Sequence, residues 1–277
     1  MASTVLITGC SSGIGAAAVR QFAAQGWNVA ATLRKPAEAR VDQGAGRVEA
    51  FALDVTDQAS VDAAVGQALA RFGAIDVLIN NAGYGLFGPF ETATREVIDR
   101  QMRTNVDGVF TVTRAVLPHM RERRQGVIIN VASLTGLVAM PLYSLYAASK
   151  FAVVGFSQSL SHELAPLGIR VKVFTPGAVA TDFSGRSLVR TFEGDGGPYA
   201  DSVQKALAAF QANRGAGNAQ SAEQLAEALY GAATDGSAQV LYVTGDDAHA
   251  ILKTRRTQRF HQGREKSIRE FVVPGLA

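Results

Sequence analysis

The sequence predicts one α/β domain, residues 1–277, with a central parallel seven-stranded sheet and helices on both faces. Short apolar, β-branched runs alternate with longer runs whose apolar residues recur every three or four positions. The short runs are apolar almost throughout, as in strands buried on both faces. Strand–helix alternation then indicates right-handed crossovers in a doubly wound fold. The expected strands are Val5–Thr8, Asn28–Leu33, Val48–Leu53, Val77–Asn80, Val127–Ala132, Arg170–Thr175 and Val240–Thr244.

Helix patterns fill the intervals between these runs. The first carries Ile14, Ala18, Val19 and Phe22 on one face, and Gly26 marks its end. Capping residues and four-residue apolar spacing predict further helices at Asp57–Arg71, from Thr94 onward and at Tyr146–Leu164.

Residues 178–218 interrupt this regular alternation and are rich in glycine. A stretch of this length inside a compact domain usually has a function. We therefore expect a flexible substrate-loop insertion that contains a short helix near Asp201–Asn213.

Composition narrows the classes of partner. The chain is 47% hydrophobic and 18% charged, which suffices for a packed core, and its formal net charge is +3. That excess is too small to indicate a nucleic-acid partner. The basic tail beyond Lys253 is interpreted as a solvated helix face, with a nucleic-acid-binding surface as the alternative.

The single cysteine, Cys10, cannot form an intrachain disulfide, which fits a reducing compartment. An apolar strand begins almost at the first residue, in place of a signal peptide, and no apolar run reaches the ~18 residues that cross a bilayer. We therefore expect a cytoplasmic protein with no membrane partner.

A glycine-rich turn joins the first strand to the first helix and reads T-G-C-S-S-G-I-G. Gly9 allows a tight turn, Gly13 allows a pyrophosphate to approach the backbone, and Gly15 lets the helix pack near the sheet. The helix N-terminus offers free N–H groups to phosphates. This strand–turn–helix context predicts a Rossmann-type dinucleotide site, although the glycine spacing differs from G-x-G-x-x-G. Its expected contacts are Gly9, Ser11, Ser12, Gly13, Ile14 and Gly15.

The end of the second strand indicates which dinucleotide binds. Folds that bind NAD usually carry a carboxylate there, whereas this chain has Arg34 and Lys35. A guanidinium can form paired hydrogen bonds with a 2′-phosphate, and the Ser11 hydroxyl can add another. NADP(H) is therefore expected in preference to NAD(H), the alternative being that Arg34 and Lys35 merely open a surface loop. Asp54 and Val55 are placed to contact the adenine, or simply to begin the next helix.

Tyr146 and Lys150 are four residues apart at the start of a predicted helix, which places them on one face. A tyrosine ordinarily has a pKa near 10, and a nearby ammonium lowers it by stabilising the phenolate. The pair therefore suits proton exchange with a substrate oxygen. Tyr143 has no such partner, because Ala147 stands four residues after it.

Polar residues follow two strands at the edge where open α/β sheets bind ligands. Ser133 follows the fifth strand and can hydrogen-bond a substrate oxygen. Asn80–Gly83 ends the fourth strand, where Asn and Gly also favour a simple turn. Asn105 lies inside a helical run that asparagine disfavours, where it can hold a kink or a water, or face solvent.

Together these motifs resemble the short-chain dehydrogenase/reductase family. The resemblance covers roughly residues 3–182, extends to the seventh strand, and is nearest to NADP-using hydroxysteroid and retinol dehydrogenases. Its matching pieces are T-G-C-S-S-G-I-G at 8–15, N-N-A-G at 80–83, Asn105, Ser133, Y-A-A-S-K at 146–150, and Pro176-Gly177 followed by Thr181.

The resemblance implies a role for each matched residue. Tyr146 is the acid or base, Ser133 orients the substrate oxygen, and Lys150 binds the nicotinamide ribose and lowers the tyrosine pKa. Asn105 holds a water that links Lys150 to solvent. The implied cofactor contacts also include Asn81, Ala82, Gly83, Pro176, Gly177, Val179 and Thr181. The family also implies a homodimer or homotetramer formed through the helices at 94–121 and 146–165.

The sequence thus predicts an NADP(H)-dependent oxidoreductase that interconverts a carbonyl and an alcohol. No metal is expected, because the histidines show no ligand spacing. A set of apolar candidate pocket residues suggests that the substrate is a lipophilic ketone or secondary alcohol. The alternative is that each of these residues packs in the core. The alternative function is a non-catalytic NADP(H) sensor or scaffold. The candidate pocket residues are Leu86, Phe87, Val138, Pro141, Leu142, Tyr143 and Phe183.

Overall fold

The computed structural model describes residues 2–36, 47–179, 188–215 and 219–257. Its main sheet has seven strands in the order β3-β2-β1-β4-β6-β7-β9, and every neighbouring pair is parallel. The predicted fold class is confirmed, and all seven predicted strands lie within one residue of the observed bounds. These are β1 Thr4–Thr8, β2 Asn28–Leu33, β3 Val48–Ala52, β4 Val77–Asn80, β6 Gly126–Val131, β7 Ile169–Pro176 and β9 Leu241–Thr244.

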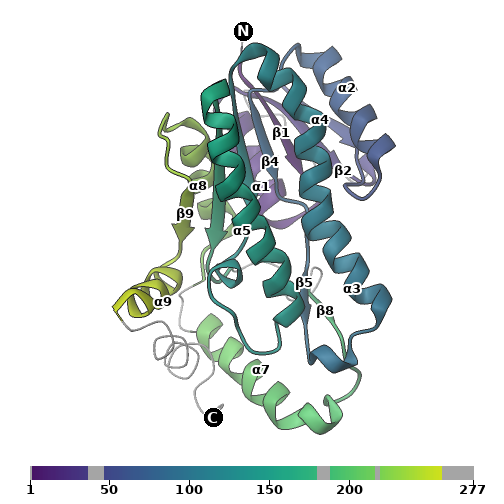
Figure 1. Cartoon of the computed structure of the whole chain (residues 1–277), viewed down its shortest axis with the longest axis vertical. Helices are drawn as coiled ribbons and strands as arrows, with labels where there is room; N and C mark the ends of the chain where they lie inside the picture. Colours follow the sequence, from purple (N-terminus) through teal and green to yellow (C-terminus); the bar gives the residue numbers. More distant parts are fainter. Residues whose placement is uncertain (1, 37–46, 180–187, 216–218, 258–277) are drawn as a thin grey trace.

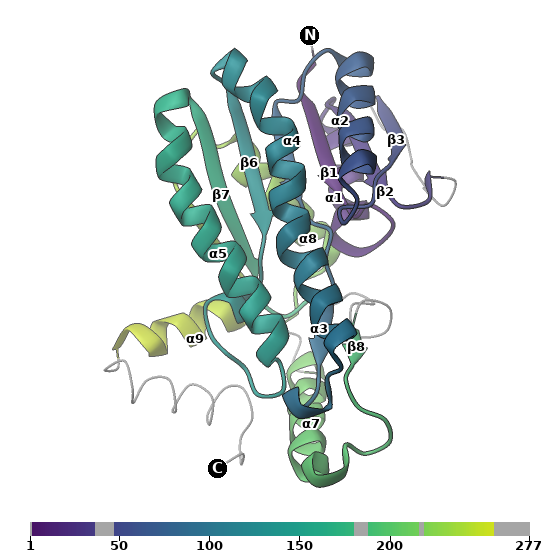
Figure 2. The same cartoon turned by 45° about the vertical axis from the view of Figure 1, so that its right-hand side comes forward.

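Helices cover both faces of this sheet (Figures 1 and 2). On one face α1 (Gly13–Ala24) packs against α8 (Ala222–Thr234), around the fully buried Phe22 and Leu229. The other face carries α2, α4 and α5, which enclose a second apolar cluster. Their bounds are Gln58–Phe72 for α2, Gly108–Arg123 for α4 and Ser144–Leu164 for α5.

The predicted capping residues begin their helices. The Asp57 side chain accepts a hydrogen bond from the Ala59 N–H at 2.9 Å and starts α2. Thr94 caps α3 (Arg95–Met102), which continues into α4 through a π-helical turn at Arg103–Asp107. Short 3-10 helices with fully described bounds include η2 (Phe90–Thr92), η4 (Leu134–Gly136), η5 (Ala165–Leu167) and η6 (Gly197–Tyr199).

The described part of the predicted insertion contains more regular structure than expected. Leu188–Arg190 forms β8, which pairs in parallel with β5 (Gly85–Phe87), and Ala200–Gly215 forms α7. Figure 2 places α7 beyond the carboxyl ends of β6 and β7. A parallel β-bridge between Val179 and Gln220 joins the two ends of the predicted insertion.

The last described helix, α9 (Asp246–Thr257), holds the start of the basic tail. Most of that tail lies outside the described residues. Within the part of the chain that the structure describes, no helix is long and apolar enough to cross a membrane.

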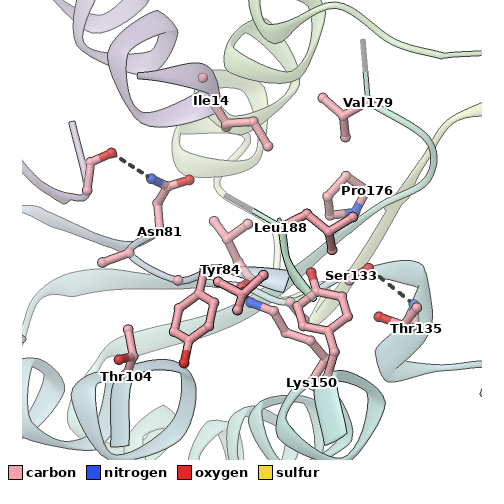
Figure 3. A pocket seen from close by; sticks show the side chains of 18 of the residues that line it. Ile14, Asn81, Tyr84, Thr104, Ser133, Thr135, Lys150, Pro176, Val179 and Leu188 are labelled. Atoms are coloured by element: carbon pink, nitrogen blue, oxygen red, sulfur yellow. Dashed lines mark hydrogen bonds between the residues drawn. The ribbon is translucent and has the colours of Figure 1, made fainter. Parts of the chain in front are cut away.

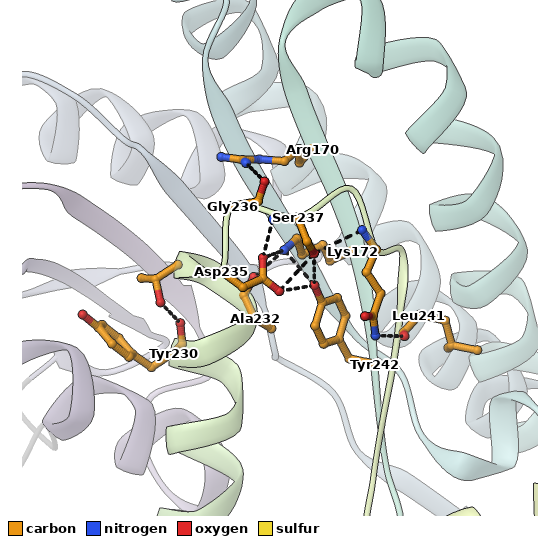
Figure 4. Close-up of polar contacts among 11 residues, drawn as sticks. Arg170, Lys172, Tyr230, Ala232, Asp235, Gly236, Ser237, Leu241 and Tyr242 are labelled. Carbon is orange, nitrogen blue, oxygen red and sulfur yellow. Dashed lines mark hydrogen bonds and ion pairs between the residues drawn. The ribbon is translucent and has the colours of Figure 1, made fainter.

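A buried lysine ties the edge strand β9 to the main sheet (Figure 4). Lys172 on β7 is 1% exposed, and its ammonium donates to Ala232 O at 2.7 Å, Asp235 Oδ1 at 2.5 Å and Tyr242 Oη at 2.9 Å. The carbonyl of Ala232 belongs to the last turn of α8, where a cation is favourable. This network joins α8, β7 and β9 around one charge.

Candidate active site

A cavity of about 1480 Å³ opens beyond the carboxyl ends of the central strands. β1 lies between β2 and β4, so the strand order reverses there, and open α/β sheets bind ligands at such a point. The cavity brings together most of the site residues expected from the sequence. Those in its wall are Gly9, Ser11, Ser12, Gly13, Ile14, Arg34, Asp54, Val55, Asn81, Ala82, Gly83, Ser133, Tyr146, Lys150, Pro176, Gly177 and Val179.

The glycine-rich turn has the geometry that a pyrophosphate requires. Gly9 and Gly13 have φ angles of 75° and 56°, which favour glycine. A Cβ on Gly15 would overlap the Gly9 carbonyl oxygen, whereas a Cβ on Gly13 would meet nothing within 4 Å. Gly15 is therefore needed for packing, while Gly13 leaves open space over the start of α1. The Asn81 side chain fixes the turn by donating to Thr8 O at 2.9 Å and Gly9 O at 3.2 Å.

The end of the cavity next to β2 and β3 carries a cation and an anion. Arg34 is exposed in the wall, close enough to Asp54 to affect its titration. Burial acts to raise the pKa of Asp54, but hydrogen bonds from Thr56 and the charge of Arg34 outweigh it and hold that pKa below its usual range. Asp54 thus stays ionised, and the exposed Arg34 guanidinium lies near this negative charge.

Tyr146 places its phenol beside two hydroxyl groups. The ring is 7% exposed, and burial raises the pKa of the phenol to about 12. Hydrogen bonding from the Ser133 side chain offsets part of this rise, and the neighbouring Thr135 hydroxyl acts in the same direction. Ser133 in turn accepts from the Thr135 N–H at 3.2 Å, as Figure 3 shows. In the protein without a cofactor, burial therefore raises the pKa of Tyr146 overall, contrary to the lowering by Lys150 that the resemblance implied. The sequence did not single out Thr135.

Lys150 lies on the same side of α5 as Tyr146. Its ammonium is 5.8 Å from the centroid of the Tyr146 ring and donates to Val131 O at 2.9 Å. The residue is 6% exposed, and burial lowers its pKa to about 8. No carboxylate forms a salt bridge with this ammonium among the described residues. Its charge is therefore directed at the cavity and the phenol.

Asn105 lies in the π-helical turn between α3 and α4 and is 1% exposed, so the solvent-facing alternative is wrong. Its amide donates to Tyr84 O at 2.9 Å and Ser149 Oγ at 3.2 Å, and its oxygen accepts from Tyr84 N at 3.1 Å. A Cβ on Gly83 would stand 3.0 Å from Asn105 Oδ1 and 3.7 Å from Lys150 Nζ. Asn105 and Lys150 therefore flank the same glycine.

The opposite wall is formed by the turn after β7. Pro176, Gly177 and Val179 line the cavity, while Thr181 lies outside the described residues. Asp247, from the first turn of α9, fixes this wall by accepting from the Ala178 N–H at 2.8 Å. Nothing in the local sequence pattern pairs Asp247 with a backbone group 69 residues earlier.

The predicted apolar pocket needs correction. Leu86, Phe87 and Val138 are at most 4% exposed and belong to the core, and Pro141 and Leu142 are not in the cavity wall. Phe87 lies beneath α7, because β8 pairs with β5 and holds that region over it. Phe183 lies outside the described residues. The apolar wall is formed by Met140, Tyr143, Leu188, Val189, Leu207 and Phe210.

Comparison with known proteins decides the family. Residues 3–189 match the family described as short chain dehydrogenase. The chain belongs to the short-chain dehydrogenase family. It is 42% identical over 203 residues to a 3-ketodihydrosphingosine reductase of Bacteroides thetaiotaomicron, covering 73% of this chain and 74% of that protein.

Solved structures agree with this assignment. A short-chain dehydrogenase from Streptomyces avermitilis superposes with a TM-score of 0.80 at 32% identity, covering 97% of this chain and 94% of the other. A 3-ketoacyl-(acyl-carrier-protein) reductase from Brucella melitensis, solved with NADH, gives a TM-score of 0.72 at 31% identity, covering 87% and 96%. This short-chain dehydrogenase therefore has the fold and the relatives of an oxidoreductase.

Proposed function

We propose that this short-chain dehydrogenase is an NADP(H)-dependent oxidoreductase that interconverts a carbonyl and an alcohol. The observation that carries the proposal is the buried phenol of Tyr146, which interacts with the Ser133 side chain and has the Lys150 ammonium 5.8 Å from its ring centroid. A sensor that only binds the cofactor has no need of a buried, uncompensated ammonium beside a phenol. The non-catalytic alternative is therefore disfavoured.

The cavity fits a dinucleotide. The open space over Gly13 and the start of α1 would hold the pyrophosphate, and Asp54 and Val55 would contact the adenosine. Arg34, exposed at that end, would bind a 2′-phosphate, which supports NADP(H) over NAD(H). Pro176, Gly177, Val179 and Thr181 would flank the nicotinamide. When bound, the reduced cofactor supplies the hydride that reduces the carbonyl carbon.

Proton transfer belongs to the residues of the chain. Because the pKa of Tyr146 is about 12, the phenol is protonated at neutral pH and can donate to the substrate oxygen as negative charge develops there. Ser133 hydrogen-bonds the same oxygen and stabilises that charge. Lys150 stabilises the resulting phenolate, and Asn105 would hold the water through which a proton returns. The protonated phenol can therefore act as the acid when a carbonyl is reduced.

The substrate we propose is a lipophilic ketone or secondary alcohol. The substrate half of the cavity is lined by Leu188, Val189, Leu207 and Phe210, which suit an apolar chain. Residues 178–218 would act as the substrate-loop insertion of a single domain that spans 1–277. The names of the two reductase relatives also refer to ketones.

We also propose a cytoplasmic homodimer or homotetramer formed through α4 and α5. Phe110 and Phe151 on these helices are 38% and 41% exposed, although large aromatic residues are usually buried. A second copy that covered both would remove this apolar surface from water. Size-exclusion chromatography with light scattering would test the assembly, and a monomer would contradict it.

The test of the proposed function is a panel of ketones and alcohols assayed with NADP(H) and with NAD(H). We expect turnover with NADP(H), and we expect Tyr146→Phe to reduce it by about 10²- to 10⁴-fold while NADPH still binds. Tyr230→Phe is the matched control, because Tyr230 packs against Phe22 and Trp27 on the other face of the sheet. Cofactor binding without turnover of any compound would favour the sensor.

A further inference from the structure

Tyr143 is a second phenol in the cavity, three residues before Tyr146. The two ring centroids lie 5.9 Å apart, and both side chains line the same cavity. The Tyr143 ring is held by Phe87 and Phe210, with centroids at 5.3 and 5.5 Å. A phenylalanine would make the same ring contacts, so these contacts do not account for the hydroxyl.

The hydroxyl of Tyr143 makes no hydrogen bond within the part of the chain that the structure describes. Among the residues that the structure describes, no side chain or backbone group hydrogen-bonds it, although a tyrosine in apolar surroundings normally finds a partner. Burial and the neighbouring Tyr146 phenol raise its pKa well above the usual value. The group therefore stays neutral, as a hydrogen-bond donor on a residue that lines the cavity.

Local structure works against a tyrosine at this position. Tyr143 occupies the N-cap of α5 and makes no side-chain cap bond, where Ser, Thr, Asp or Asn would stabilise the helix by roughly 1 kcal/mol. Leu142, directly before it, has a φ of 62°, which is strained for a bulky residue. The carbonyl of Leu142 accepts from the Gly88 N–H at 2.8 Å, which secures the strained turn.

Gly88 is equally constrained, since its φ is 140° and a Cβ there would overlap Thr191. Two unfavourable local choices, an absent cap and a strained leucine, thus converge on the residue that brings a phenol to the cavity. Such conflicts between local preference and structure concentrate at functional sites.

We propose that Tyr143 is a specificity-determining residue that donates a hydrogen bond to a second oxygen of the substrate. The substrate class is then a carbonyl compound with another oxygen two carbons away, such as a β-keto ester, β-keto thioester or β-hydroxy ketone. Tyr146 serves the reacting oxygen and Tyr143 the second one. Because the two ring centroids lie 5.9 Å apart, two hydroxyls that each donate over about 2.7–2.8 Å can serve two oxygens of one substrate. The inference rests on the proposed function.

The test compares two ketones of equal chain length. In ethyl 3-oxohexanoate an ester follows the ketone, and in 4-nonanone methylenes replace that ester. Tyr143→Phe should lower kcat/KM about five- to tenfold for the keto ester, as expected for the loss of one neutral hydrogen bond, and leave 4-nonanone within twofold. Equal effects on both compounds, or none on the keto ester, would overturn the inference.

Tyr199→Phe is the matched control. Tyr199 packs in the same apolar cluster, but its hydroxyl donates to Glu91 Oε2 at 2.5 Å and it does not line the cavity. This variant should leave the ratio of the two kcat/KM values unchanged. A change equal to that of Tyr143→Phe would show that general loosening of the cluster, and not the missing donor, is responsible.

Product binding supplies a readout that does not need turnover. Calorimetry should show ethyl 3-hydroxyhexanoate binding to the NADP⁺-loaded protein about five- to tenfold more weakly in Tyr143→Phe, with no change for 4-nonanol. If the wild type turns over no compound of the ketone and alcohol panel with either cofactor, the proposed function fails. If Tyr143→Phe leaves binding of the hydroxy ester unchanged, the inference alone fails.

Discussion

The ammonium of Lys150 lies 5.8 Å from the centroid of the Tyr146 ring, and both residues are almost fully removed from water. Burial acts on the two groups in opposite directions, lowering the pKa of Lys150 to about 8 and raising that of Tyr146 to about 12. In each case it penalises the charged form. Keeping Lys150 charged in this buried site therefore costs folding free energy. Removing the charge should change the measured stability of the protein.

Lys150→Met should abolish turnover and stabilise the protein at pH 7. The folded pKa of about 8 lies below the unfolded value of ~10.4, so the unfolded state binds more protons and stability rises between these pH values. The ammonium thus costs about 3 kcal/mol below pH 8, from which ~1 kcal/mol is subtracted for the lost bond to Val131 O. We expect a net gain of ~2 kcal/mol at pH 7 that disappears near pH 10.

Lys172→Met is the matched control for this prediction. Lys172 is also buried, but it pairs with Asp235 and hydrogen-bonds two further oxygens, so its removal should destabilise by about 3 kcal/mol. Denaturant unfolding at pH 7 and pH 10 measures both variants. A loss of stability in Lys150→Met at pH 7 would contradict the account of the buried ammonium.

Arg34→Ala should weaken NADPH binding by about 10- to 100-fold, because a charge-assisted hydrogen bond to a phosphate contributes ~1.5–3 kcal/mol. NADH lacks the 2′-phosphate, so its affinity should change by less than twofold. Fluorescence titration with both cofactors provides the measurement. Arg95→Ala serves as the control, since Arg95 pairs with Asp99 and does not line the cavity. Equal losses for the two cofactors would refute the role of Arg34.

Gly13→Ala and Gly15→Ala should behave differently. Gly15→Ala forces a Cβ against Gly9 O and should destabilise the fold by about 1–3 kcal/mol. Gly13→Ala meets no neighbour, so it should cost about 1 kcal/mol for its φ of 56° and chiefly reduce the Tm increase that NADPH induces.

Gly66→Ala is the control for both glycine variants. Gly66 is an exposed position in α2 with open space around it, and alanine there should stabilise by ~0.5–1 kcal/mol. Thermal unfolding with and without NADPH separates the three variants. A normal NADPH-induced shift in Gly13→Ala would mean that the pyrophosphate does not approach this glycine.

Asp247→Ala should destabilise the wall after β7 by about 1.5–3 kcal/mol, because the Ala178 N–H loses a charged acceptor. Asp247→Asn keeps an acceptor and should lose less. A Cβ on Gly177 would overlap the Asp247 carboxylate, so Gly177→Ala should be less harmful in the Asp247→Ala background. The unfolding free energies of the wild type, Asp247→Ala, Gly177→Ala and the double variant measure the coupling between the two residues. Additive effects would contradict the contact.

Much of the fold follows from neighbours in the chain. The seven strands and the caps of α2 and α3 were predicted because apolar periodicity and capping depend on residues within one or two turns. The glycine turn and the spacing of Tyr146 and Lys150 are similarly local. For this reason the sequence also indicated most of the residues that line the cavity.

The remaining features depend on contacts that no local pattern encodes. Tyr143 was expected as one of several residues lining an apolar pocket, and it does line the cavity. Its place beside Tyr146 depends on the strained turn at Leu142 and on packing against Phe87 and Phe210. The pairing of β5 with β8 likewise moves Leu86 and Phe87 from the expected pocket into the core.

The sequence by itself determined the order of the elements, the dinucleotide turn and the pairing of one phenol with one ammonium on a single helix, because each of these is fixed by short spacings along the chain. Only the tertiary structure decided the burial that sets the pKa values of Tyr146 and Lys150, the anchor at Asp247 and the second phenol at Tyr143. Burial and long-range hydrogen bonds arise when distant segments pack together, so no stretch of sequence specifies them alone.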